Sequence, residues 1–133
     1  MRILIVDDDY ISRVKLSQLL APYGHCENAP DGTIALRLFE AAQKELVPYN
    51  LVTMDIEMPD LTGQEVLMGI RRIEKDWETP AKKVAKVLMI TAKDTAKDVV
   101  SAYYENYDGF LAKPVNAERL RKSLVDLKVD IGR

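Results

Sequence analysis

Short apolar runs alternate with longer amphipathic segments along the chain. The apolar runs occupy residues 3–6, 24–29, 51–54, 84–91 and 109–112, of which the second is the weakest. Runs of four to eight apolar residues are typical of strands that are buried on both faces, as in parallel sheets. The pattern therefore predicts the strands of one parallel sheet.

The segments between these runs have the period of an α-helix. They cover residues 10–21, 32–45, 64–77, 96–107 and 117–128. Asp31 and Asn116 precede two of them and are expected to be their N-caps. The buried face of the first helix is expected to hold Ile11, Val14, Leu16, Leu19 and Leu20, and that of the third Val66, Leu67, Ile70, Ile73 and Trp77.

Strands that alternate with helices in this way predict an α/β fold, with a parallel sheet between two helical layers. The 133 residues fit one domain, for which we expect a core over residues 2–128. The few residues after Lys128 are too short to form an output domain.

Composition excludes several function classes. The net charge of −2 gives no general attraction to nucleic acid or to an anionic membrane. Cys26 is the only cysteine and His25 the only histidine, which excludes an intrachain disulfide and a two-histidine zinc site. The first apolar run is too short for a signal peptide or a membrane span, so a cytoplasmic protein is expected.

Polar residues stand where the predicted strands end. Asp7, Asp8 and Asp9 follow the first strand, and Asp55 follows the third. Thr91 closes the fourth strand, and Lys113 follows the fifth. Each alone has a simpler explanation, such as a helix cap, a strand residue or a solvated charge. Because the carboxyl ends of parallel strands meet at one edge of a sheet, we expect these side chains to converge there.

Such a cluster suits phosphoryl chemistry. Carboxylates that lie together repel one another unless a cation resides among them, and oxygen ligands of this kind suit Mg²⁺. An aspartate beside Mg²⁺ is a competent nucleophile toward phosphorus. The Lys113 ammonium and the Thr91 hydroxyl would supply donors to the phosphoryl oxygens.

Four segments in this order, ILIVDDD, TMDIEMPDLTG, LMITA and FLAKP, resemble the receiver domain of two-component response regulators, including the chemotaxis-type single-domain members. The resemblance covers residues 2–128. It implies a doubly wound, flavodoxin-like (βα)5 fold with strand order 2-1-3-4-5. It also implies a phosphorelay function, with a phosphoryl group taken from a sensor histidine kinase or a histidine phosphotransfer protein. The chain would catalyse its own modification without being a turnover enzyme.

By this resemblance Asp55 is the phosphoacceptor. Asp8 binds Mg²⁺ directly, with Mn²⁺ as an alternative metal, and Asp7 acts largely through water. Asp55 supplies a second ligand oxygen and the backbone carbonyl of Glu57 a third. Thr91 and Lys113 match the residues that hold the phosphoryl oxygens, whereas Asp9 is interpreted as a helix cap.

The resemblance also assigns roles around the site. The Lys113–Pro114 peptide bond is expected to be cis, and Pro59 and Gly63 to shape the loop after Asp55. Phe110 is the aromatic residue that would turn into the space that Thr91 leaves on phosphorylation, although core packing explains a strand phenylalanine equally well.

The sequence leaves the roles of two further groups of residues open. Glu57 and Lys93 stand where the family varies the phosphate lifetime, and they either pair across the mouth of the site or are solvated. The lysines of residues 74–86 either form a partner surface or lie in a solvated loop. In the family, the fourth helix, fifth strand and fifth helix often form the homodimer or downstream-partner surface, and nothing in the sequence decides whether this chain dimerises.

Two alternatives to the receiver remain. A Mg²⁺-dependent phosphatase of the haloacid-dehalogenase type would use the first acids, Thr91 and Lys113, but no acidic pair follows Lys113 and Asp55 would have no role. A degenerate receiver that acts only as a binding module would lack one of the acids, the threonine or the lysine. All of them are present.

Overall fold

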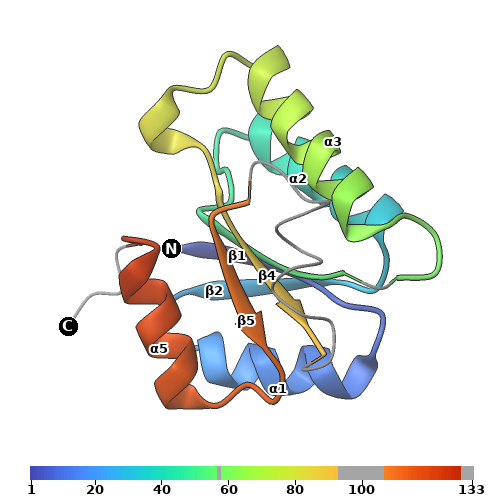
Figure 1. The fold of residues 1–133 in the computed structure, drawn as a ribbon. Helices are drawn as coiled ribbons and strands as arrows, with labels where there is room; N and C mark the ends of the chain where they lie inside the picture. Colours follow the sequence, from blue (N-terminus) through green and yellow to red (C-terminus); the bar gives the residue numbers. More distant parts are fainter. Residues whose placement is uncertain (57, 93–106, 130–133) are drawn as a thin grey trace.

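The computed structural model describes residues 1–56, 58–92 and 107–129. Its strands form one parallel sheet with the order β2-β1-β3-β4-β5, which confirms the predicted topology (Figure 1). They are β1 (Arg2–Val6), β2 (His25–Ala29), β3 (Leu51–Asp55), β4 (Lys86–Thr91) and β5 (Gly109–Ala112). Each neighbouring pair is parallel and in continuous register, so that all carboxyl ends meet at the same edge.

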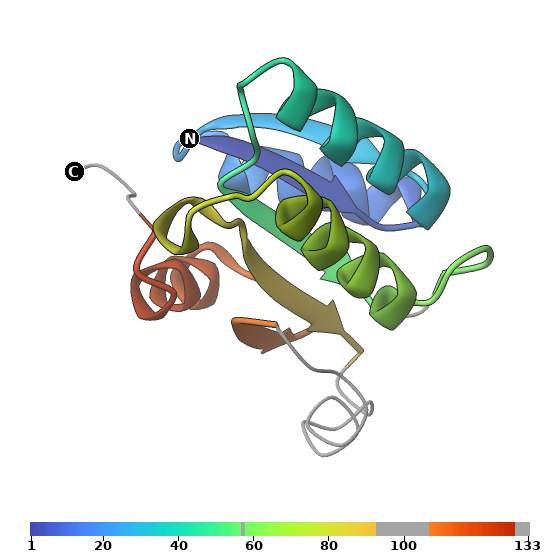
Figure 2. The same cartoon turned by 90° about the horizontal axis from the view of Figure 1, so that it is seen from above.

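The helices of the described residues are α1 (Tyr10–Leu20), α2 (Gly32–Lys44), α3 (Gly63–Asp76) and α5 (Ala117–Asp126), with a short 3-10 helix η1 (Ala81–Lys83) before β4. Helices α2 and α3 cover one face of the sheet, and α1 and α5 cover the other (Figures 1 and 2). The helix expected over residues 96–107 lies, except for its last residue, outside the described residues. None of the helices in the described ranges is long and apolar enough to cross a membrane.

The central strands are apolar on both faces because both faces are covered. One core cluster joins alternate strand residues such as Leu4, Val52 and Val87 to α2 and α3. The other joins their neighbours, such as Ile5, Leu51 and Leu88, to α1 and α5. Three of the five apolar runs are therefore the central strands β1, β3 and β4, and the other two are the edge strands β2 and β5.

Side-chain caps fix where several helices begin. The Asp31 carboxylate accepts a hydrogen bond from the Ile34 backbone N–H, as expected of an N-cap. Asn116 accepts from the backbone N–H of Arg119 in the same way. Helix α3 begins with a capping box between Thr62 and Glu65, which starts it one residue earlier than predicted.

The structure corrects two packing expectations and one strand boundary. On α1, Ile11 and Val14 are exposed by 74% and 38%, and only Leu16 and Leu20 are buried. Trp77 is also exposed; it is the C-cap residue of α3, just beyond the last residue of the regular helix. Strand β4 begins at Lys86 and not at residue 84, since η1 and the turn after it occupy the preceding segment.

Candidate functional site

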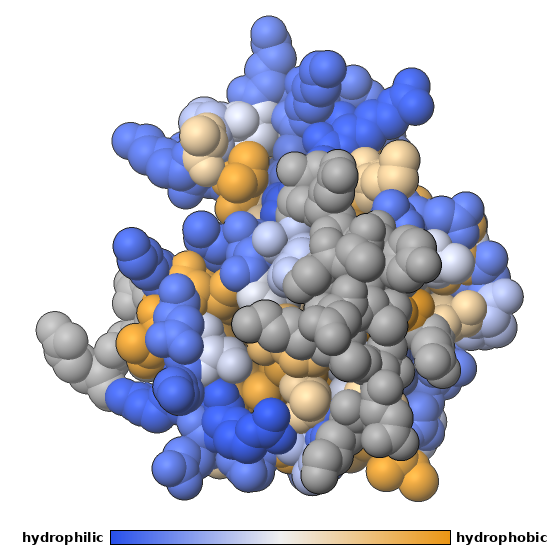
Figure 3. All heavy atoms as spheres, in the orientation of Figure 1, coloured by the Kyte–Doolittle hydropathy of each residue, from blue (hydrophilic) through white to orange (hydrophobic). Residues whose placement is uncertain are grey.

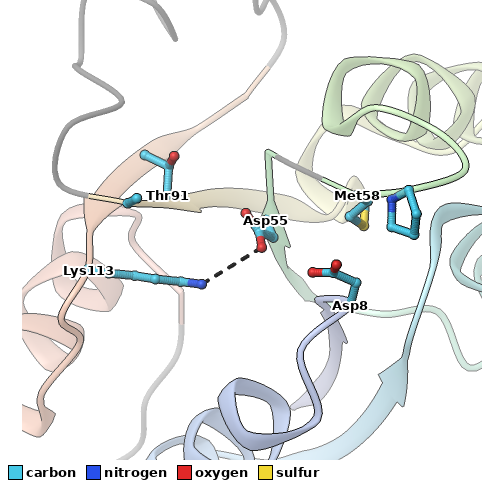
Figure 4. A pocket seen from close by; sticks show the side chains of 7 residues that line it. Asp8, Asp55, Met58, Thr91 and Lys113 are labelled. Carbon is cyan, nitrogen blue, oxygen red and sulfur yellow. Dashed lines mark ion pairs between the residues drawn. The ribbon is translucent and has the colours of Figure 1, made fainter.

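The polar residues singled out at the strand ends do gather at one edge of the sheet. Asp8 lies just after β1, Asp55 ends β3, Thr91 ends β4 and Lys113 follows β5. Together with Met58, Pro59 and Ala92 they line an open hollow of about 370 Å³. Figure 4 shows the side chains of Asp8 and Lys113 directed toward Asp55. The parallel register is what brings residues more than 100 positions apart to this one place.

Three carboxylates form the acidic part of the site. One oxygen each from Asp7, Asp8 and Asp55 lies within 4.8 Å of the others. Asp7 is 1% exposed, Asp55 is partly buried and Asp8 is open to solvent. The buried Asp7 carboxylate accepts a hydrogen bond from the Asp9 backbone N–H at 2.9 Å. Like charges this close raise the free energy of the metal-free protein unless cations compensate them.

Lys113 provides part of that compensation. Its Nζ lies 3.4 Å from an Asp7 carboxylate oxygen and 3.8 Å from one of Asp55. The backbone that carries it is well anchored: the Lys113 N–H donates to the Thr91 carbonyl at 2.7 Å. The Arg119 guanidinium donates to the carbonyls of Ala112 and Pro114, at 2.8 and 2.6 Å. The Lys113–Pro114 peptide bond is cis, the form that the resemblance implied.

The donor set fits a hard divalent cation. It consists of carboxylate oxygens, one of them open to solvent, and nothing among the described residues adds a nitrogen or sulfur ligand to the cluster. Mg²⁺ binds through one or two carboxylates with several waters, and an open hollow leaves room for those waters and for phosphate oxygens. The acidic triad is thus of the kind that holds Mg²⁺ in proteins.

The remaining predicted residues lie around this center. Asp9 is the residue before α1 and accepts a hydrogen bond from the Ser12 hydroxyl at 2.8 Å. That bond lowers the pKa of Asp9. Asp9 occupies the N-cap position of α1, but its side chain makes no cap hydrogen bond to the helix backbone, and its own N–H donates to the Asp7 carboxylate of the triad. Pro59 lines the hollow. A Cβ on Gly63 would lie 3.1 Å from the Asp55 carbonyl oxygen, so the close approach of this loop favours glycine.

Phe110 lies on β5 opposite Met89 of β4, and packs against the core cluster under α2 and α3. Thr91 and Met89 are two positions apart on β4, and their side chains therefore share one face of the sheet. Phe110 and Thr91 are thus on the same face, near each other along the strands. Glu57 and Lys93 lie outside the described residues.

One residue near the site was not singled out from the sequence. The Asp60 carboxylate accepts hydrogen bonds from the backbone N–H groups of Gly32 and Thr33, at 3.0 and 2.9 Å, and from the Thr33 hydroxyl at 2.7 Å. These bonds, chiefly that of the hydroxyl, lower the pKa of Asp60. They tether the loop that carries Met58 and Pro59 to the N-terminus of α2. The partners lie almost 30 residues apart, which no local pattern reveals.

Comparisons with known proteins agree with this geometry. The family model described as the response regulator receiver domain matches residues 3–125. Protein PilH of Pseudomonas aeruginosa is 35% identical over 127 residues, which cover 92% of this chain and 93% of that protein. The chemotaxis protein CheY of the same organism is 29% identical over 126 residues, covering 93% of each.

A solved structure is similar over nearly the same length. The response regulator protein TrrA of Thermotoga maritima, in complex with Mg²⁺-BeF, superposes with a TM-score of 0.74 at 31% sequence identity. The match covers 95% of this chain and 97% of that one.

Proposed function

This chain belongs to the response regulator receiver domain family, and we propose that Asp55 is the residue that accepts the phosphoryl group. As a receiver domain, the chain is a phosphoacceptor in two-component signalling and not a turnover enzyme. The observation that carries the proposal is the contact of Lys113 with both Asp7 and Asp55, inside a cluster of three carboxylates. Only Asp55 of these three ends a central strand and lines the hollow.

Transfer proceeds by nucleophilic substitution at phosphorus. One Asp55 carboxylate oxygen attacks the phosphoryl group of a phosphohistidine on a sensor kinase or a phosphotransfer protein. The phosphorus–nitrogen bond breaks, and the imidazole leaves as it takes up a proton. Hydrolysis by a water that attacks the acyl phosphate in line later restores the Asp55 carboxylate.

Mg²⁺, or Mn²⁺ in its place, would be held by Asp8, Asp55 and the Glu57 backbone carbonyl, with Asp7 acting through water. When bound, the metal supplies positive charge that neutralises the phosphoryl oxygens. Lys113 and Thr91 hold the other phosphoryl oxygens. The Lys113 ammonium already contacts Asp55 at 3.8 Å, so it needs only a small shift to reach a group attached to that carboxylate.

The phosphoryl group then biases a two-state switch. As Thr91 moves toward the new oxygens it vacates space on its face of the sheet, and Phe110 turns inward to fill it. Phe110 is partly buried and already packs at the margin of that core cluster. Because phenylalanine has no hydroxyl, the switch rests on packing alone.

The face of α1 next to the site is the docking surface for the phosphodonor protein. Transfer requires the donor histidine to come within bonding distance of Asp55, so the donor must cover the rim of the hollow. Tyr10, Ile11 and Val14 lie on α1, which begins directly after the three aspartates that follow β1, and they are exposed by 69%, 74% and 38%. Three exposed apolar side chains close to a site favour binding of a protein partner there. We also propose that the chain acts in the cytoplasm, where such a donor would meet it.

The downstream partner, or a second copy of the chain, binds the face that includes β5 and α5. Glu57 and Lys93 stand where the family varies the lifetime of the phosphorylated form; pairing between them would obstruct the attacking water, whereas solvated side chains would not. Replacement of both by alanine is expected to speed dephosphorylation of the phosphorylated chain. An unchanged rate would leave them as solvated side chains.

Intact-mass spectrometry after incubation with acetyl phosphate and Mg²⁺ tests the proposal. We expect one phosphoryl adduct on the wild-type chain, none on Asp55→Asn and none with EDTA. Asp126→Asn, which changes an exposed aspartate of α5, is the matched control and should still form the adduct. An adduct that survives Asp55→Asn would assign the acceptor to another residue, and sustained phosphate release by that variant would support the phosphatase alternative.

A further inference from the structure

A second hollow lies at the opposite edge of the sheet, where β1, β3 and β4 begin. It has a volume of about 550 Å³, and Asn50, Lys82, Lys83, Lys86 and Lys128 are among the residues that line it. Lys86 begins β4, and Thr91 of the candidate phosphoacceptor site ends it. Five strand steps of about 3.3 Å separate them, so the two hollows lie roughly 17 Å apart along the sheet. In Figure 3 a notch is visible on the left of the molecule, where Figure 1 places the N-terminus and η1, and hydrophilic side chains with some hydrophobic ones border it.

Positive charge converges on this hollow from separate parts of the chain. Lys82 and Lys83 belong to η1, Lys86 to β4, and Lys128 follows α5. In the described part of the chain, none of their ammonium groups has an ion-pair or hydrogen-bond partner. None of the lining residues is acidic. In a chain with a net charge of −2, this concentration does not follow from composition.

Asn50 adds a fixed hydrogen-bond donor. Its backbone N–H donates to the Arg2 carbonyl at 2.8 Å, and its own carbonyl accepts from the Lys86 N–H at 2.9 Å. Its side-chain oxygen accepts from the Arg2 N–H at 2.7 Å. Since the oxygen is engaged, the amide nitrogen is the end left without a partner among the described residues. The Asn50 side chain is therefore held with an N–H₂ group available to a ligand in the hollow.

These groups select the chemistry of a ligand. Four ammonium groups and one amide nitrogen are all donors, so the ligand must carry several acceptor oxygens and negative charge. Lysine binds phosphate as a point charge, and the volume is within the range of small-molecule sites. The donors come from four separate segments around one hollow, so a compact anion can reach them together, whereas an extended acidic polymer would also have to contact the surface outside it. We propose that this hollow binds an oligophosphate anion, either free or as the phosphate chain of a nucleotide.

Titration calorimetry with inorganic tripolyphosphate in EDTA and low salt tests the proposal, since chelation keeps metal from bridging the anion to the acidic triad. We expect binding that weakens with added salt, and at least tenfold weaker binding in Lys86→Ala/Lys128→Gly. Lys128 has a φ of 61°, which glycine adopts without strain, so this substitution removes the charge without harming the helix end. Lys44→Ala/Lys122→Ala, which removes two lysines that do not line the hollow, should bind as the wild type does.

The side-chain amide resonances of Asn50 in an NMR titration locate the anion. They should shift together with the backbone resonances of Lys82, Lys83 and Lys86. A parallel titration with ATP separates the two sources: equal affinity means that the phosphate chain alone is recognised, and tighter ATP binding means that the nucleoside also contacts the hollow.

Three results would overturn the proposal: no binding of either anion, equal affinity in Lys86→Ala/Lys128→Gly, or shifts confined to the Asp8 and Lys113 edge. Binding of a polyglutamate peptide without binding of tripolyphosphate would also overturn it, and would assign the hollow to an acidic protein segment. Because phosphorylation of Asp55 is measured separately, failure here leaves the receiver function untouched.

Discussion

Thr53 places a hydroxyl inside the sheet. It lies in the middle of β3 between Ile5 and Leu88, is 1% exposed, and has no hydrogen-bond partner for its Oγ1 among the described residues. An unpartnered buried hydroxyl costs about 1–3 kcal/mol of desolvation, whereas valine has the same shape and no such cost. A strand position of this kind would be filled more favourably by an apolar residue.

We therefore expect Thr53→Val to raise the free energy of unfolding by roughly 1 kcal/mol in urea denaturation at pH 7. Thr33→Val is the matched control. The Thr33 hydroxyl donates to Asp60 at 2.7 Å, so the same substitution there should be destabilising. A loss of stability in Thr53→Val would show that its hydroxyl finds a partner in solution.

Glu27 links three segments at the amino edge of the sheet. Its carboxylate accepts from the Tyr49 hydroxyl at 2.6 Å and pairs with the Arg2 guanidinium, which lies over the Tyr49 ring. The Tyr49 bond, followed by that of Arg2, lowers the pKa of Glu27 from its usual 4.5. The ionised carboxylate therefore stabilises the fold above about pH 4.5, and this contribution disappears as the pH falls through the lower pKa of the folded state.

Glu27→Gln is accordingly expected to be less stable than the wild type at pH 7, with the difference shrinking as the pH falls toward 3. The measurement is the urea unfolding free energy of both proteins across that range. A difference that stays constant with pH would mean that the charge of Glu27 contributes nothing and that only its shape matters.

At the scale of elements, three helices end without the glycine that commonly follows an α-helix. Helices α2, α3 and α5 are each followed by a residue in the left-handed region, Leu46, Glu78 and Lys128, with φ of 62°, 51° and 61°. In each case this residue and the next donate back to carbonyls of the last helical turn. Glycine is the usual residue at such a position because a Cβ is strained there. None of the three is glycine, so each helix end stores some strain.

Leu46→Gly should therefore stabilise the protein by roughly 0.5–1 kcal/mol, the strain relieved at φ > 0 less the greater freedom of an unfolded glycine. Leu46 is 83% exposed, so little burial is lost. Leu46→Ala removes the same exposed side chain but keeps the Cβ, and it should leave the thermal midpoint unchanged. Equal effects of the two substitutions would attribute the change to the side chain and not to the backbone.

The sequence predicted the presence of helices and strands better than it predicted which of their faces are buried. The strands were readable because both faces of the central sheet are buried, which makes their apolar runs continuous. The buried face of α1 could not be predicted from the sequence, because apolar residues surround much of this helix. Ile11 also lies beside the acidic edge of the sheet, and its side of the helix is uncovered in the described residues. The start of β4 depends on a distant partner: buried Glu74 accepts from the Ala85 N–H at 2.6 Å, so the chain is held before the strand begins.

At the scale of the whole molecule, the candidate site followed from topology, since parallel strands carry their last residues to one edge. The second hollow, at the other edge, could not be predicted from topology, because η1, β4 and the end of α5 meet only in the folded chain. The result is a molecule with carboxylates clustered at one end of the sheet and lysines at the other. At the acidic end, the carboxylates that would bind a cation lower the stability of the fold when the cation is absent, because their charges repel one another.

That competition is measurable in thermal unfolding. Asp8 takes part in the carboxylate cluster and has no ion pair with Lys113, which contacts Asp7 and Asp55. In EDTA, Asp8→Asn should raise the midpoint by a few degrees, since one repulsion of roughly 1 kcal/mol is removed. Mg²⁺ should stabilise the wild type through binding to the folded state and stabilise Asp8→Asn much less. Asp126→Asn should respond to Mg²⁺ as the wild type does. A midpoint for Asp8→Asn below that of the wild type in EDTA would mean that Asp8 stabilises the fold by contacts that outweigh the repulsion.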